Sequence, residues 1–171
     1  MAAEPSTLYK LMILYMLKKV NFPLSNPQMW TFFEQKGYTT YFTFQQVIGQ
    51  LKDANLLSEE AVRNTVLYEI TPQGEDALFY FSNDISTPIK DEIDSYLSEN
   101  SFQMRNETGI TADYHRTEAR DYIVHAKVRE GRSTLFEMNI SVPTEEEAKI
   151  LCEHFEENAQ TIYAYIMKHL M

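Results

Sequence analysis

The spacing of the apolar residues changes once along this chain, near Asn100. Before that point, apolar side chains recur every three or four residues, which is the period of an α-helix. After it, apolar and polar residues alternate in three segments, residues 110–115, 122–129 and 136–142, which is the period of a strand with one buried face. A chain with helices first and strands later predicts an α+β fold whose two halves are built differently.

The alternating half predicts a three-stranded antiparallel sheet packed on a long helix. Residues 130–132 read as the hairpin turn between the second and third strands, and one face of the sheet is expected to stay wet. The helix is expected over residues 145–169, with three glutamates in its first turn, where the helix dipole favours negative charge. Its apolar residues form one broad stripe: Ala148, Leu151, Cys152, Phe155, Ala159, Ile162, Tyr163, Ile166 and Leu170.

The helical half predicts three helices followed by a two-stranded hairpin. In chain order, they are expected at residues 6–20, 28–36, 43–54, 58–63 and 66–70. Ser, Thr and Asn side chains accept the orphan N–H groups of a first turn, whereas Asn and Gly tolerate the left-handed backbone of a helix end. The expected caps are Ser6 or Thr7 and Asn26, and the expected left-handed stops are Asn21, Gly37 and Asn55.

The run Thr71-Pro72-Gln73-Gly74 predicts a helix that starts close to a sheet. Thr71 can cap the helix, Pro72 suits its first position, and Gly74 lets the backbone approach the sheet closely. The order of helix, helix, helix, hairpin and helix is that of a winged helix-turn-helix. We therefore predict a winged helix-turn-helix domain over residues 1–84, a connecting helix within residues 85–100, and the sheet with its long helix over residues 101–171.

Two segments of the helical half resemble bacterial regulators of the MarR and PadR type. Residues 50–57 look like the end of a recognition helix, and residues 68–78 look like the end of a wing. The whole chain also resembles an uncharacterised family of Gram-positive bacterial proteins, domain-of-unknown-function family 4364, whose members are described as winged-helix DNA-binding proteins. This resemblance implies the fold more than the function, since it supplies no established substrate or operator.

Charge is distributed unevenly along this chain of 171 residues, whose net charge is −10. Residues 1–57 carry five lysines against three acidic residues, whereas residues 91–171 carry eight basic and sixteen acidic residues. The slightly basic part suits DNA, and the acidic part is expected to stay away from it.

The longest apolar run, residues 11–17, is far shorter than the ~20 residues of a membrane span. The single cysteine, Cys152, excludes an internal disulfide, and we expect a cytoplasmic protein with no membrane partner.

The outward face of the third helix is the candidate DNA-binding surface. A stripe of Phe44, Val47, Ile48 and Leu51 is expected to be buried, which leaves a glutamine-rich face outside. Glutamine can pair with adenine in the major groove, and residues before the helix and in the wing can hold phosphates. The candidate DNA-binding residues are Lys36, Thr40, Tyr41, Thr43, Gln45, Gln46, Gly49, Gln50, Lys52, Arg63 and Asn64.

Double-stranded DNA and a second copy of the chain are the expected partners. Helix-turn-helix proteins commonly pair, because two half-sites double the contacts with DNA. The broad stripe of the last helix, together with the sheet, is the expected surface of this homodimer. The same C-terminal module is expected to dimerise, to bind a small-molecule effector, or to do both.

Other classes of function fit less well. A winged helix can also serve as a protein-interaction scaffold without DNA, and the weakly basic third helix and the ten aromatic residues within residues 1–44 suit that alternative.

An enzyme is not expected, because the sequence holds no phosphate loop, dinucleotide motif, nucleophile elbow or metalloprotease motif. His115 and His125 are interpreted as solvated strand residues rather than metal ligands, and Cys152 as a buried thiol. We expect no catalytic residue, cofactor or metal.

Overall fold

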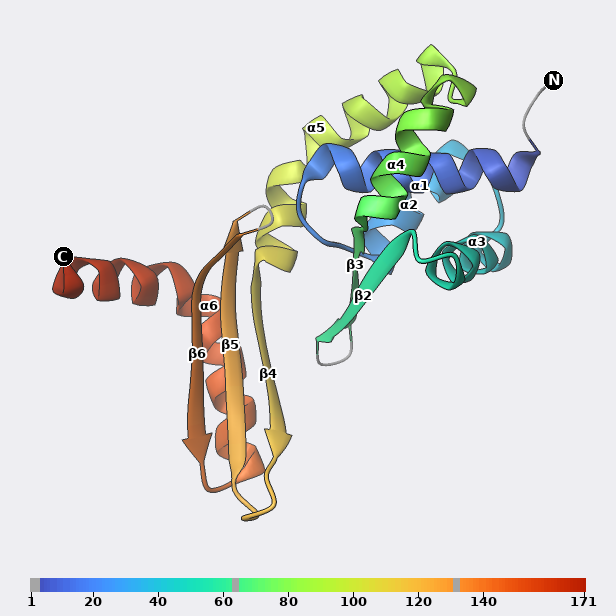
Figure 1. Cartoon of the computed structure of the whole chain (residues 1–171). Helices are drawn as coiled ribbons and strands as arrows, with labels where there is room; N and C mark the ends of the chain where they lie inside the picture. Colours follow the sequence, from blue (N-terminus) through green and yellow to red (C-terminus); the bar gives the residue numbers. More distant parts are fainter. Residues whose placement is uncertain (1–3, 63–64, 131–132) are drawn as a thin grey trace.

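Two groups of elements make up the chain, and one long helix joins them (Figure 1). The computed structural model describes residues 4–62, 65–130 and 133–171. Helices and a small sheet form the first group, here called the helical group. A larger sheet and the last helix form the second, here called the sheet group. The expectation of an α+β fold is confirmed.

The helical group contains the predicted helices and hairpin. Its small sheet is antiparallel with the order β1-β3-β2, and its first strand was expected only as extended chain. The elements of the group, in chain order, are α1 (Pro5–Val20), β1 (Leu24–Ser25), α2 (Asn26–Lys36), α3 (Tyr41–Asp53), β2 (Leu57–Val62), β3 (Thr65–Ile70), α4 (Pro72–Phe81) and the short 3-10 turn η1 (Ser82–Asp84).

Two of the predicted helix caps are wrong. α1 begins at Pro5, after Glu4, whose side chain makes no capping hydrogen bond, so neither Ser6 nor Thr7 is the cap. Proline fixes the helical φ angle at the first position and needs no hydrogen bond there, which explains the earlier start.

The cap of α2 is Ser25 rather than Asn26. The Ser25 hydroxyl accepts from the Gln28 N–H, and the Gln28 side chain accepts from the Ser25 N–H. This reciprocal pair satisfies two orphan donors at once, so it is favoured over a single Asn cap. Thr40 caps α3, which therefore starts at Tyr41, before the predicted position. The left-handed residues Asn21, Gly37 and Asn55 are confirmed.

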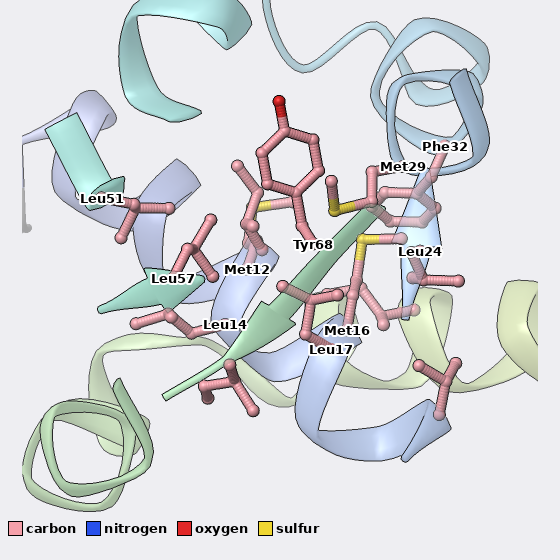
Figure 2. Close-up of a cluster of buried hydrophobic side chains, with 14 of the residues drawn as sticks. Met12, Leu14, Met16, Leu17, Leu24, Met29, Phe32, Leu51, Leu57 and Tyr68 are labelled. Carbon is pink, nitrogen blue, oxygen red and sulfur yellow. The ribbon is translucent and has the colours of Figure 1, made fainter. Parts of the chain in front are cut away.

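Densely packed apolar side chains hold the helical group together. Figure 2 shows side chains from α1, α2, α3 and the small sheet meeting around β3, with Tyr68 beside Met12 and Met29. The tight start of α4 is confirmed, since a Cβ on Gly74 would stand 2.3 Å from the carbonyl oxygen of Leu56. Thr71 caps this helix as expected.

The connecting helix α5 (Thr87–Gly109) is longer than predicted. It was expected within residues 85–100 but continues to Gly109. Its middle packs on the helical group through Ile93 and Tyr96. Its last turns are held by Gln28 of α2, whose amide donates to the Met104 carbonyl (3.4 Å) and to the Glu107 carboxylate (2.7 Å). These contacts come from a distant helix, so the local apolar spacing does not reveal them.

The sheet group follows the predicted plan. Strands β4 (Ile110–Arg116), β5 (Tyr122–Glu130) and β6 (Ser133–Val142) form an antiparallel sheet in that order, and α6 (Glu145–Leu170) packs on one face. Of the turn expected at residues 130–132, residues 131–132 lie outside the described part of the chain. Within the described residues, no helix combines the length and the apolar character needed to cross a membrane.

Candidate functional site

The inner and outer faces of α3 differ as the sequence predicts. Phe44, Val47, Ile48 and Leu51 are buried in the helical group. On the opposite side, Gln46 and Gln50 are exposed. Gly49 lies between them, and no atom lies within 4 Å of the place where its Cβ would stand. This helix therefore presents an open surface on which polar side chains lie beside the exposed ring of Phe42, and a large partner can approach it closely.

The entry to α3 holds four of the candidate residues. Residues 37–40 form the turn between α2 and α3, and Lys36 is exposed just before it. The Thr40 hydroxyl accepts from the Thr43 N–H, and the two hydroxyl groups lie 3.1 Å apart. The Tyr41 ring contacts the Trp30 ring edge-on, and the two ring centroids lie 5.3 Å apart. Thr40, Thr43 and Tyr41 thus also stabilise the start of the helix.

Two other candidates are engaged within the chain. The Gln45 amide exchanges two hydrogen bonds with the Asn26 amide, at 3.0 and 2.9 Å, and the side chain is half-buried. The Lys52 ammonium lies 2.7 Å from the Glu59 carboxylate of β2, and this hydrogen bond raises the pKa of Lys52. Arg63 and Asn64 lie outside the described residues. The open polar surface therefore centres on Gln46, Gly49 and Gln50.

The β2–β3 hairpin carries acidic residues that contact the sheet group. The Arg129 guanidinium of β5 lies 2.6 Å from Glu69 and 3.6 Å from Glu60, and the Lys127 ammonium lies 3.2 Å from Glu60. The Arg129 side chain is only 13% exposed, so these carboxylates offset the cost of burying its positive charge. The cluster of Glu60, Glu69, Lys127 and Arg129, here called the ion cluster, joins the hairpin to the large sheet.

Sequence reasoning missed the ion cluster. The alternation along β5 places Lys127 and Arg129 on the sheet face that was expected to be exposed to solvent. The β2–β3 hairpin covers that face at the end of β5 where these two residues lie. The carboxylates that bind them lie 60 and 67 positions earlier in the chain. A charged residue on a strand names no partner by itself, so only the folded arrangement shows the cluster.

An apolar groove lies on the opposite face of the sheet, between α6 and strands β5 and β6. It encloses about 250 Å³ and is lined mainly by apolar side chains. The groove lining consists of Val124, Ala126, Met138, Ile140, Leu151, His154, Phe155, Asn158 and Ile162.

On the other face of the sheet, the His125 imidazole lies 3.2 Å from the Glu137 carboxylate. The described residues contain no group of three or more His, Cys, Asp or Glu side chains arranged to hold a metal ion.

A family model described as a domain of unknown function, DUF4364, matches residues 9–170. The match covers both groups of elements and the helix between them. No curated protein and no solved structure matches the chain.

Proposed function

The chain belongs to the DUF4364 family, and we propose that it is a DNA-binding transcriptional regulator that acts as a homodimer in the cytoplasm. In this proposal the helical group is a winged helix-turn-helix. α2 and α3 are its helix-turn-helix, and the β2–β3 hairpin is its wing. α3 enters the major groove, as the second helix of this motif does in known complexes.

The outward face of α3 is the observation that carries the proposal. It presents two exposed glutamines on either side of Gly49, whose surroundings are open. Glutamine offers the donor and acceptor that match the major-groove edge of adenine. The four-residue turn with Gly37 that precedes α3 has the length typical of a helix-turn-helix.

The charges near α3 favour base contacts over strong phosphate binding. Lys52 is paired with Glu59, and the wing glutamates Glu60 and Glu69 are paired with cations of β5. Few positive charges then remain for phosphates, so we expect a shallow dependence of affinity on salt. A small-molecule effector stays a prediction, because no observation identifies its chemistry.

The proposal is tested by gel shift of the full chain with fragmented genomic DNA of its own organism, at ~50 mM salt, where electrostatic binding is strong. Wild type is expected to retain a few fragments selectively. The Gln46→Ala/Gln50→Ala variant should lose this retention by about tenfold or more, since a bidentate base contact contributes ~1–3 kcal/mol. Gln73→Ala, at an exposed glutamine of α4, is the matched control and should bind as wild type does. Equal retention by all three proteins contradicts a role for α3.

A protein-interaction scaffold is the second candidate function. Tyr41 and Phe42, at the start of α3, are 55% and 72% exposed, and exposed apolar side chains that lie together are typical of a protein-interaction surface. If wild type retains no DNA at ~50 mM salt, the scaffold replaces the regulator as the better account.

A further inference from the structure

The sheet group leaves two apolar surfaces uncovered in a single chain. The first is the groove described above, along the β6 side of α6. Buried residues of this group lie on β4, β5 and the first part of α6, whereas the apolar residues of β6 are only half-buried. The half-buried residues of β6 are Phe136, Met138, Ile140 and Val142.

The second surface is the end of α6, residues 160–171. All of them are described, and none of them is buried. Figure 1 shows α6 bending, so that this end turns from the direction of the first part of the helix and extends past β6, away from the sheet. It nevertheless continues the apolar stripe through Ile162, Ile166 and Leu170, and Leu170 is 80% exposed. A stripe that continues beyond its own sheet indicates that something else covers it.

The protruding stripe is shorter than the groove, so it fits within it, and the two surfaces meet at Ile162. Along α6 the groove runs from Leu151 to Ile162, which is about 16 Å at 1.5 Å per residue. The protruding stripe runs from Ile162 to Leu170, which is about 12 Å. When the protruding end of a partner's α6 lies antiparallel in the groove and the two copies meet at Ile162, its Leu170 therefore comes beside Leu151 and His154.

Charge also favours this antiparallel pairing. Lys168 and His169 follow Ile162 by six and seven positions, whereas Glu157 and Glu153 precede it by five and nine. Crossing at Ile162 brings the basic end of each helix toward the acidic part of the other. The contact is self-complementary, because each copy supplies one helix end and one groove, as a closed two-fold dimer requires.

We propose that the α6 end of one copy lies in the groove between α6 and β6 of a second copy, and the reverse. The proposal rests on the homodimer proposed above and says where its two copies meet. It assigns the groove to a protein partner of the same sequence rather than to a small apolar ligand.

Sedimentation equilibrium of the full chain tests this interface, with Leu170→Glu as the probe. Because Leu170 is exposed in one copy, the change should leave the fold intact, which circular dichroism verifies. It should weaken the dimer by at least about tenfold, since burying a leucine contributes ~1.5–3 kcal/mol. Phe79→Glu, at a residue of α4 that is 78% exposed, is the matched control and should leave the dimer unchanged.

A mixture of Leu170→Cys and His154→Cys chains gives a direct second readout. Mild oxidation should produce a disulfide-linked heterodimer, whereas a mixture of Phe79→Cys and His154→Cys chains should not. A monomer at all concentrations, or a dimer that is unaffected by Leu170→Glu and forms no cross-link, overturns the interface. A cross-linked dimer that fails to retain DNA keeps the interface and removes the regulator, so the two proposals fail separately.

Discussion

The helical group and the sheet group differ in how fully they enclose their apolar residues. In the helical group, the core side chains Phe32, Phe33 and Phe44 are enclosed completely, while the outward face of α3 combines exposed glutamines with the exposed ring of Phe42. In the sheet group, alanines make up most of the buried residues, and the large side chains of β6 stay half-buried.

This difference indicates that the two groups face different kinds of partner. A core whose large side chains are enclosed within one chain needs no protein partner to complete it. A group that leaves a contiguous apolar surface open is typical of a protein interface. In the function proposed above, DNA therefore binds the helical group and a second copy binds the sheet group.

The largest effect on the free energy of unfolding is expected when one phenylalanine is replaced in each group and the two losses are compared. Phe32→Ala should lower the free energy of unfolding by about 3–5 kcal/mol, because the residue is fully enclosed. Phe136→Ala, on half-buried β6, should cost only about 1–2 kcal/mol in dilute protein. Urea unfolding measures both, and the fluorescence of Trp30, the single tryptophan, reports the helical group. Similar costs for the two changes would break the comparison.

A smaller effect is expected at the ion cluster, where the two groups meet. Arg129→Ala should destabilise the chain by about 2 kcal/mol, because it leaves Glu60 and Glu69 together without their guanidinium. Arg116→Ala, at an exposed arginine of β4, is the control and should cost less than about 0.5 kcal/mol. If Glu69→Gln added to Arg129→Ala costs as much as it does alone, the two side chains are not coupled and the cluster does not join the groups.

The smallest predicted effect concerns Tyr38, in the turn before α3. Its hydroxyl donates to Glu92 of α5 at 2.6 Å, and burial together with this bond raises the pKa of Tyr38 from 10.0 to about 12. A raised pKa in the folded state stabilises the fold below pH 10, and this contribution is lost as the pH rises toward 12. Tyr38→Phe should cost about 1 kcal/mol at neutral pH and nothing near pH 12. A cost that does not change with pH removes the proposed role of this bond.

The sequence predicts most elements of the fold, because their signals are local. The period of the apolar residues and the residues Thr71, Asn21 and Gly37 mark where elements begin and end, and the structure agrees at these positions. The length of α5 could not be predicted, since its last turns depend on Gln28, 76 positions before Met104. The cap of α2 was misplaced by one residue because Ser25 and Asn26 are both good capping residues.

The candidate site is predictable only in part, for a similar reason. The buried stripe of α3 fixes which residues point outward, so Gln46 and Gln50 are exposed as expected. The partners of Gln45 and Lys52 lie on other elements and could not be read from the helix itself. The ion cluster joins residues 60–69 to residues 127–129, and the groove lies where α6 packs on β5 and β6, so no single local pattern contains either of them.

Hydrogen–deuterium exchange of the full chain, with and without sheared duplex DNA at ~50 mM salt, tests the division of partners most directly. If the division is right, DNA slows exchange in the turn at residues 37–40 and in α3, while exchange in α6 is unchanged. Slower exchange confined to α6 and β6, with none at α3, would contradict it.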